Sequence, residues 1–354
     1  MQSENKRIKK ISEIGINHDG SLEKALEMIR VSADCGADIV KFQMFQAHHM
    51  YTPKAGQYKA ATGEMIDIYE VVKKMELPQD WIPELLKESK ACGVEFLLTI
   101  CDVESLERAV KNGVRYIKVA SYEISHLPLF EAIGKTGLPV IFSTAGSCLG
   151  DVEEALMALG HQDNVCVMQC NGQYPAARHI VNMNVLKTLQ YAFPDLSIGF
   201  SDHTEDPVEA PIAAVTLGAE YIEKHFTLDK ASLGPDHCFA VDPAGLRRLV
   251  EAVRESERKT ANGEVIDIDP IILGSSNKTM LTEEQYLCGF AFRTLYAKKD
   301  IHAGDVFSKE NITVLRAGQQ ESGLHPRELK NLIGKRSPKG IEQHEPINWK
   351  SLLL

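Results

Sequence analysis

Two histidines stand at the ends of two neighbouring apolar segments. His203 lies in the motif SDHT, and His225 ends the motif EKH. Residues 208–217 between them are rich in Ala, Val and Leu and are followed by Gly218, which predicts a crossover helix. A strand–helix–strand unit makes its two strands parallel, so we expect both histidines at one carboxyl edge of a sheet. Two imidazoles that converge among acidic residues predict a site for a divalent metal ion.

Cationic and hydroxyl side chains end other apolar segments. Lys41 and Lys118 each fall near the end of such a run, as do Ser121, Ser143 and Ser201. Lysine supplies a point charge and hydroxyls supply directional donors, so this set suits a ligand that carries a phosphate and a carboxylate. Two alternatives remain open: the lysines form ordinary salt bridges, or one of them forms a Schiff base as in a class I aldolase.

Eight apolar, β-rich segments run through the first two-thirds of the chain. We expect strands at 8–17, 37–45, 94–101, 116–122, 139–145, 165–170, 196–200 and 220–226. Helical patterns lie between them, as at 22–33, 81–91, 105–110, 128–133 and 152–159, and several end at a glycine. Eight consecutive units predict a (β/α)₈ TIM barrel. An open doubly wound sheet is disfavoured because no GxGxxG follows the first strand.

The pattern changes near the end of the chain. We expect a barrel domain at 1–268, a polar linker at 269–285 and a small β-rich domain at 286–354. In the small domain residues 301–312 resemble residues 341–352, which predicts two similar halves, each with a turn, a short strand and a capped helical turn. So short a segment buries little surface, and we expect it to pack on the barrel or on a second subunit.

The composition disfavours several classes of protein. The chain has 354 residues, 44% of them hydrophobic, and a net charge of −10 without a long basic cluster, which argues against nucleic acid as a partner. No apolar run approaches the roughly 20 residues that span a bilayer, so no membrane is expected. The eight cysteines fall in apolar patterns with no secretory signal ahead of them, which predicts buried, reduced thiols in a cytoplasmic protein.

Other ionisable residues are expected to have structural roles. Carboxylates at a barrel rim commonly orient lysines, so Asp102, Glu123 and Glu223 are expected to support other site residues or to have structural roles. A position on the surface or in a loop is expected for the remaining histidines considered, which are His18, His48, His49, His126 and His237.

Longer motifs resemble one known family, the N-acetylneuraminate (sialic acid) synthases. They are EIGINHDGS at 13–21, IGFSDHT at 198–204, EKHFTLDK at 223–230 and GPDH at 234–237. The C-terminal segment is similar to the antifreeze-like SAF domain of that family. Within the family, KFQMFQ, KVASYEISHLPL, FSTAG and GLHPR most resemble the spore coat polysaccharide biosynthesis protein E subgroup.

The resemblance implies a metal-dependent condensation of phosphoenolpyruvate with the open-chain aldehyde of a 2-acetamido hexose, N-acetylmannosamine or a related sugar. The products would be a nine-carbon 2-keto sugar acid and phosphate, for a surface or spore polysaccharide. It implies Mn²⁺ or Mg²⁺ on His203 and His225, with Glu13 close to both substrates. It places phosphoenolpyruvate at Lys41, Thr99, Lys118, Ser121, Ser143 and Ser201, and the sugar at Gln43, Tyr174, Asp236 and Arg316. It also implies a homodimer in which Arg316 of the SAF domain reaches the partner's barrel.

Several positions depart from the family pattern, mostly on the sugar side. Gly172 replaces an asparagine expected near phosphoenolpyruvate, with Asn171 beside it as the candidate substitute. Cys238-Phe239-Ala240 follow GPDH in place of a small polar run. The sequence therefore does not identify the acceptor sugar. Tyr174 packing on the rim, a solvated Arg316, and a sugar-acid binding protein without catalysis are the alternatives that stay open.

Overall fold

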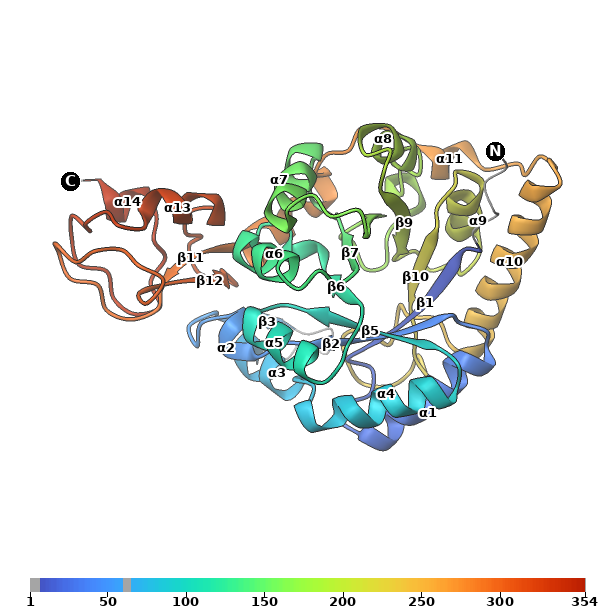
Figure 1. Ribbon diagram of the computed structural model, residues 1–354, viewed down its shortest axis with the longest axis horizontal. Coiled ribbons are helices and arrows are strands. Elements are labelled where there is room, and N and C mark those ends of the chain that lie inside the picture. The colour runs from blue at the N-terminus through green and yellow to red at the C-terminus, as the bar shows by residue number, and fades with distance from the viewer. Residues whose placement is uncertain (1–6, 60–64, 354) are drawn as a thin grey trace.

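The computed structural model describes residues 7–59 and 65–353 and contains a closed barrel of eight parallel strands (Figure 1). Neighbouring strands follow the order β1-β10-β9-β8-β7-β6-β5-β2. The barrel strands are β1 (Lys9–Gly15), β2 (Ile39–Met44), β5 (Glu95–Ile100), β6 (Ile117–Val119), β7 (Val140–Ser143), β8 (Val165–Cys170), β9 (Ser197–Asp202) and β10 (Tyr221–His225). The (β/α)₈ prediction is confirmed.

Helices lie between consecutive barrel strands and cover the outside of the sheet (Figure 1). Side-chain caps begin several of them: Ser21 accepts from the backbone N–H of Lys24, and Asp102 accepts from that of Ser105. The covering helices are α1 (Leu22–Asp34), α4 (Ile82–Ala91), α5 (Val103–Lys111), α6 (Leu127–Gly134), α7 (Leu149–Leu159), α8 (Val185–Ala192), α9 (Glu209–Thr216) and α10 (Pro243–Ala261).

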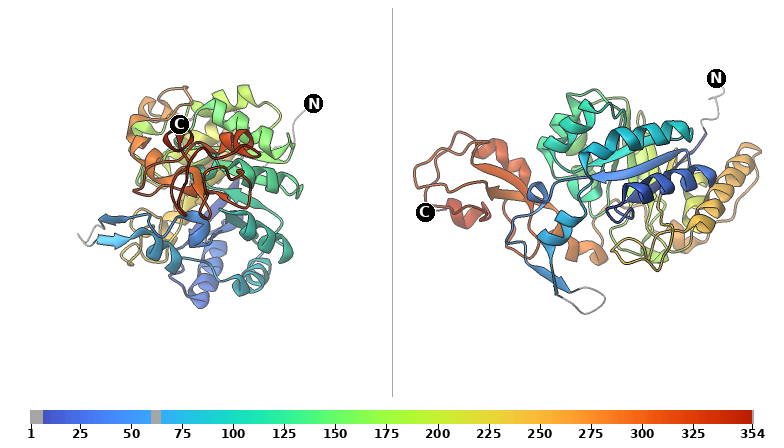
Figure 2. Two further views of the ribbon diagram at one scale, coloured as in Figure 1. Left: turned by 90° about the vertical axis from the view of Figure 1, so that its left-hand side faces the viewer. Right: turned by 90° about the horizontal axis from the view of Figure 1, so that it is seen from below.

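The segment after β2 is more elaborate than a single helix, and the sequence patterns did not predict it. It contains a short helix, an antiparallel hairpin and a second helix: α2 (Ala47–Met50), β3 (Gln57–Lys59), β4 (Met65–Asp67) and α3 (Ile68–Lys74). The hairpin projects from the body of the barrel (Figure 2). Short 3₁₀ turns at Gln79–Trp81, Ser121–Glu123 and Arg178–Ile180 complete the barrel domain.

The barrel has an outer core and an inner one. The outer faces of the strands pack against the helices in one large apolar cluster, which includes Phe42, Phe142 and Phe200. The interior holds a smaller layer near the middle of the strands, formed by Ile11, Ile39, Leu97, Ile141, Cys166 and Met168. This layer closes the barrel below the carboxyl ends of the strands.

The C-terminal domain lies at the opposite end of the molecule from α10 (Figure 1). Its strands β11 (Arg293–Ala297) and β12 (Ile312–Arg316) are antiparallel, and α13 (Leu329–Leu332) and α14 (Trp349–Leu352) flank a separate apolar cluster. Its two similar halves pair with each other, since Ile301 forms a bridge with Ile341. The second half ends in the predicted helical turn, capped by Asn348, whereas the first continues into β12.

The segment expected as a linker makes specific contacts with the barrel. It contains α11 (Pro270–Leu273) and a 3₁₀ turn (Thr282–Glu284), and α12 (Gln285–Ala291) starts at its last residue. Ile272 is fully buried in the barrel's outer core. Despite its polar composition, this segment packs on the barrel through Ile272.

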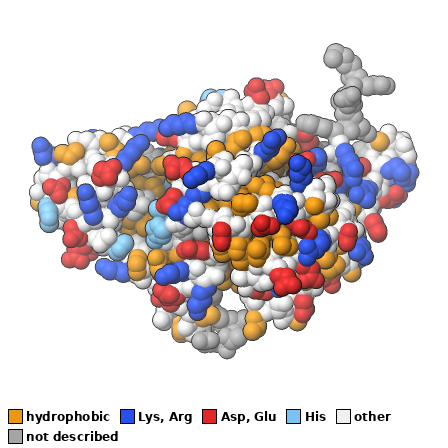
Figure 3. All heavy atoms as spheres, turned by 60° about the horizontal axis from the view of Figure 1, so that its bottom comes forward, with side chains coloured by type: hydrophobic (Ala, Val, Ile, Leu, Met, Phe, Trp, Pro, Cys, Tyr) orange, Lys and Arg blue, Asp and Glu red, His pale blue; other side chains and the backbone are white. Residues whose placement is uncertain are grey.

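The surface mixes charges of both signs. Basic and acidic side chains are interspersed over the face shown in Figure 3. Within residues 7–59 and 65–353 no helix has the length and apolar character needed to cross a bilayer. Seven cysteines have described side chains, and Cys148 and Cys238 among them are exposed, so the expectation of buried thiols is only partly right. The side chain of Cys288 lies outside the described residues.

Candidate active site at the carboxyl ends of the barrel strands

The alternation of side chains along each strand determines which residues point into the barrel. Residues two apart on a strand face the same side of the sheet, so each position two residues beyond the inner apolar layer also points into the barrel. Those positions carry Glu13, Lys41, Thr99, Ser143 and Cys170. On β10 the same alternation places Glu223 and His225 beyond Tyr221.

A buried network of charges occupies the centre of this layer. The Lys41 Nζ lies 3.0 Å from Glu13 Oε2 and 3.2 Å from Glu223 Oε1. Lys118 Nζ lies 3.6 Å from the same Glu223 oxygen and donates to Ser143 Oγ at 2.6 Å. Glu223 therefore orients both lysines, as predicted for it.

The pKa values of the two lysines shift in opposite directions. Burial opposes the charge on Lys41, but Glu13 and Glu223 raise its pKa above the ordinary lysine value. Burial lowers the pKa of Lys118, and Glu223 only partly offsets that effect. Burial also opposes the charge on Glu223, yet the two lysines lower its pKa to about 2. Burial raises the pKa of Glu13, which makes it the carboxyl group of this network most able to hold a proton.

The hydroxyl residues predicted to hold a phosphate and a carboxylate line the same layer. Thr99 Oγ1 accepts from Lys41 Nζ at 3.2 Å, and Ser201 Oγ donates to Glu223 Oε1 at 2.9 Å. Ser121 Oγ accepts from the backbone N–H of Ala145 at 3.0 Å. All are buried, as are both lysines. The structure thus brings together every residue of the predicted anion set.

The two histidines of the predicted metal pair converge at the ends of β9 and β10. Their ring centroids are 5.4 Å apart. The Nδ1–H of His203 donates to the carbonyl oxygen of Asn171 at 2.6 Å, because a carbonyl can only accept, and this leaves Nε2 available as a ligand. His225 Nδ1 is buried without a hydrogen-bond partner, although Asp236 Oδ2 lies 3.6 Å from it.

This donor set fits a divalent cation. An unpartnered buried imidazole nitrogen is costly unless something binds it. Burial lowers the pKa of His225 well below its ordinary value, and the neighbouring His203 lowers it further, so His225 is neutral as a metal ligand must be. Two imidazoles leave room for water and substrate oxygens in the coordination sphere of such an ion.

Aromatic rings form one wall beside the histidines. Tyr174 stacks on His203 with a centroid distance of 4.0 Å, and Phe239 lies 5.1 Å from both Tyr174 and His225. The predicted sugar residue Gln43 lies deeper, where its Nε2 donates to Glu13 Oε1 at 2.6 Å. Burial raises the pKa of Asp236 to about 7, with a further contribution from Glu13.

Arg316 is neither solvated nor extended away from its own chain. Its Nη2 donates to Glu123 Oε1 at 2.6 Å, and its guanidinium lies over the rings of Tyr51 and Tyr122. The second oxygen of Glu123 accepts from Arg293 Nε at 2.5 Å. Glu123 therefore has the structural role expected of it, and the residues that it holds are two arginines of the C-terminal domain. In the single chain described, Arg316 lies on its own barrel.

Asp102 has a structural role, as expected, since it caps α5. His18, His126 and His237 lie in loops, as expected, although their side chains are buried, whereas His48 is exposed and His49 is half-buried. His126 caps α6, and His237 binds Thr227 and Asp19 through its two nitrogens.

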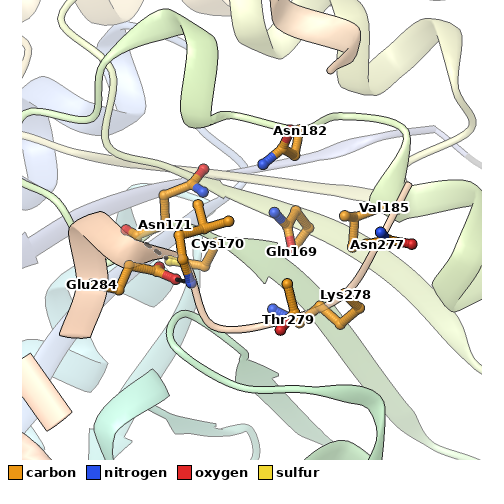
Figure 4. Close-up of a pocket in the computed structure, with 10 residues that line it drawn as sticks. Gln169, Cys170, Asn171, Asn182, Val185, Asn277, Lys278, Thr279 and Glu284 are labelled. Atoms are coloured by element: carbon orange, nitrogen blue, oxygen red, sulfur yellow. Dashed lines mark hydrogen bonds between the residues drawn. The ribbon is translucent and has the colours of Figure 1, made fainter. Parts of the chain in front are cut away.

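The connector adds contacts that no sequence signal indicated. Glu284 accepts from the backbone N–H of Gly146 at 3.2 Å and of Gly172 at 2.7 Å, in the loops after β7 and β8. Lys278 donates to the carbonyl of Thr144, and Figure 4 shows it near Gln169 and Thr279, with Glu284 on the side of Cys170 and Asn171. These residues line a small pocket behind the end of β8.

Asn171, the candidate substitute for the asparagine expected at position 172, is bound within its own loop. Its Nδ2 donates to the carbonyl of Ile180 at 2.7 Å, and it belongs to the pocket behind β8 drawn in Figure 4. The amide is therefore committed to its own loop.

Comparisons with known proteins agree with this architecture. The profile of the NeuB family matches residues 28–265, and that of the SAF domain matches residues 292–353. The spore coat polysaccharide biosynthesis protein SpsE of Bacillus subtilis is 43% identical over 347 residues, which are 97% of this chain and 93% of the relative. A crystal structure of that protein matches with a TM-score of 0.88, covering 98% of this chain and 96% of the other.

A second relative has a more specific printed name. The N,N'-diacetyllegionaminic acid synthase of Campylobacter jejuni is 34% identical and covers 95% of this chain and 98% of its own length. The family profile matches well over half of the chain, and the relatives match nearly all of it. The chain therefore belongs to the NeuB family and carries a SAF domain at its C-terminal end.

Proposed function

We propose that this chain is a sugar-acid synthase that condenses phosphoenolpyruvate with a 2-acetamido hexose in its open-chain aldehyde form. The observation that carries the proposal is the single buried layer in which Lys41 and Lys118 face hydroxyl donors while His203 and His225 converge beside them. Relatives named as synthases of N-acetylneuraminate-9-phosphate, diacetyllegionaminate and pseudaminate support the reaction class. The resemblance to SpsE supports a place in spore or surface polysaccharide biosynthesis.

Phosphoenolpyruvate is held by charge and by directional donors. Lys118 and Lys41 supply the positive charge, and Thr99, Ser121, Ser143 and Ser201 supply hydroxyls around the anion. Glu223 contacts both lysines, so it pre-organises them for the anion.

The two histidines are proposed to serve the aldehyde oxygen, and Glu13 is proposed to serve the proton transfers. A divalent ion bound by His203 and His225 would supply Lewis-acid polarisation of the aldehyde oxygen. Glu13, whose pKa is raised by burial, is placed to give a proton to the new hydroxyl or to take one from the water that replaces phosphate. Carbon–carbon bond formation leaves a cationic carbon that this water attacks, and the tetrahedral intermediate then expels phosphate.

The acceptor faces a wall that is partly apolar. Tyr174 and Phe239 present rings, and Asp236 and Gln43 present polar groups. Such a wall suits a sugar with methyl or acetamido substituents rather than one that is hydroxylated throughout. Arg316 contacts the sugar in this proposal, from its position above Tyr51 and Tyr122. A homodimer remains part of the proposal, and light scattering of the purified chain tests it.

The deciding assay is phosphate release from phosphoenolpyruvate. A panel of 2-acetamido and 2,4-diacetamido hexoses is tested with and without Mn²⁺, and release is expected only with both acceptor and metal. His225→Ala is expected to lower release by at least about 100-fold with an unchanged circular-dichroism spectrum. His302→Ala, at an exposed histidine of the SAF domain, is the matched control. Undiminished turnover in His225→Ala would refute the metal role, and no release with any acceptor would refute the reaction.

One observation favours a second candidate chemistry, a Schiff-base aldolase. Burial lowers the pKa of Lys118, which is what a nucleophilic amine requires. Lys41 is held protonated by two carboxylates and is unsuited to this role. Borohydride trapping of substrate on Lys118, together with turnover in the presence of a chelator, would establish the aldolase instead. Tight sugar-acid binding without turnover would indicate a non-catalytic binding protein.

A further inference from the structure

A second cluster of metal-ligating side chains lies on the barrel rim, away from β9 and β10. His48 and His49 are neighbours on α2, which follows β2, and Glu104 is on α5, which follows β5. β2 and β5 pair side by side in the barrel, so their following segments meet at the same part of the rim. A position on the surface or in a loop was expected for these two histidines, and the proposed reaction uses neither of them.

The geometry of the three side chains is that of a preformed ligand set. One ligand atom from each residue lies within 4.8 Å of the others. His49 Nε2 is 3.0 Å from Glu104 Oε2, and the rings of His48 and His49 have centroids 4.1 Å apart. Ligand atoms around tetrahedral zinc are about 3.3 Å apart, given Zn–N bonds of about 2.0 Å, so small side-chain rotations close the cluster.

We propose that His48, His49 and Glu104 form a zinc site. Two imidazoles and one carboxylate are a zinc donor set, and the exposure of His48 leaves a coordination position open to water or to a ligand. In the part of the chain that the structure describes, no other group of three His, Cys, Asp or Glu side chains converges this closely.

Arg108 competes with a metal ion for Glu104. It is bound to the other oxygen of Glu104, one helical turn along α5. The side-chain oxygen of Gln46 offers Arg108 a second acceptor once the amide is turned, at 3.1 Å from Nη2. Arg108 can therefore keep a partner when Glu104 Oε2 turns to the metal ion.

The site is connected to the junction between the barrel and the SAF domain. The backbone carbonyl of His49 accepts from Arg293 Nη1, and Arg293 begins β11. A bound ion cross-links α2 to α5 and thereby stiffens the rim on which β11 is seated. Ligands that bind only the folded chain stabilise it in proportion to their affinity, so zinc is expected to raise the melting temperature.

The test separates this site from the histidine pair in the barrel. Zinc binding is measured on the full-length His225→Ala chain by competition with a chromophoric chelator, in excess Mg²⁺. One equivalent is expected to bind, and adding His48→Ala or Glu104→Gln is expected to weaken it at least about tenfold. His302→Ala in the same background is expected to change nothing. Cobalt substitution is expected to give the absorption bands of a tetrahedral ion, which disappear with His48→Ala.

A variant could also lose zinc binding because it unfolds, so the melting temperature of each variant is measured without metal. Equal melting temperatures of the metal-free chains show that lost binding reflects lost ligands. Zinc affinity within threefold of the background in either His48→Ala or Glu104→Gln overturns the proposal. So does a variant whose zinc-dependent rise in melting temperature is retained.

Discussion

Replacement of Glu123 by glutamine is expected to loosen the SAF domain from the barrel. The Glu123 side chain is fully buried, and it binds Arg293 at 2.5 Å and Arg316 at 2.6 Å. Glu123→Gln keeps the shape but leaves two guanidinium groups beside a neutral amide. Removing one partner of a buried ion pair costs about 3–5 kcal/mol. Arg293 retains the carbonyl of Cys101 at 2.8 Å, so we expect the lower end, about 3 kcal/mol.

The assay is amide hydrogen exchange of β11 and β12, with β8 as the internal reference. A loss of about 3 kcal/mol corresponds to roughly 100-fold faster opening, since about 1.4 kcal/mol is a factor of ten. Glu154→Gln is the matched control, because it also removes a contact between the two domains. Its partner Arg327 lies 3.1 Å away, and the two side chains are 30% and 47% exposed, so about 0–1 kcal/mol is expected.

The pH dependence of stability is a second test of the contact between Glu123 and the two arginines. Burial opposes the charge on Glu123, but Arg293 and Arg316 lower its pKa below the ordinary glutamate value. The unfolded chain therefore binds a proton more readily, so this stability is present above about pH 4.3 and is lost as the pH falls below it. Glu123→Gln should remove that acid-sensitive part. Equal exchange in Glu123→Gln and Glu154→Gln would refute the reasoning.

Three further substitutions test other contacts. Glu284→Ala removes the acceptor of the Gly146 and Gly172 amides, so we expect phosphoenolpyruvate affinity, measured by calorimetry, to fall about tenfold while unfolding changes less. Burial lowers the pKa of Lys278 to about 8, so the unfolded chain binds an extra proton between pH 8 and 10. Wild-type stability should therefore rise relative to Lys278→Met by up to about 1.4 kcal/mol per pH unit in urea titrations. Gly323→Ala would place a Cβ 2.0 Å from the carbonyl oxygen of Leu295, and we expect a loss of about 1–3 kcal/mol by denaturation. Gly150→Ala, which meets only Cys148 Sγ at 3.6 Å, is its control, and equal effects of the two would contradict the steric argument.

Local patterns predicted the barrel and most of the buried charged layer at the carboxyl ends of its strands. Strand β8 was predicted with the same bounds that the structure has, 165–170, because a run of buried apolar residues between turns has few alternatives. The helix between His203 and His225 was predicted to within a residue at each end, and Gly218 follows it with φ of 82°. Once the strands are known, their period of two already places Lys41, Lys118 and Glu223 inside the barrel.

The contacts between distant segments were the ones that patterns missed. The arginine partners of Glu123 could not be named from the sequence, because they lie 170 and 193 residues further along the chain. Lys278 and Glu284 lie in a stretch whose composition is that of an exposed connector, and only packing shows where their charges lie. The burial of His18 and His237 depends on loops that fold over the barrel end, which periodicity does not report.

The sequence by itself determined the order of the eight barrel strands, the barrel and the residues that gather at its carboxyl end, because these depend on local periodicity and on the parallel geometry of strand–helix–strand units. The family resemblance added the expected metal and substrates. The tertiary structure decided which partner each charge takes, where the SAF domain sits and which histidines converge on the rim. Those outcomes depend on side chains far apart in the sequence, whose meeting is set by packing and by the cost of leaving a buried charge unpaired.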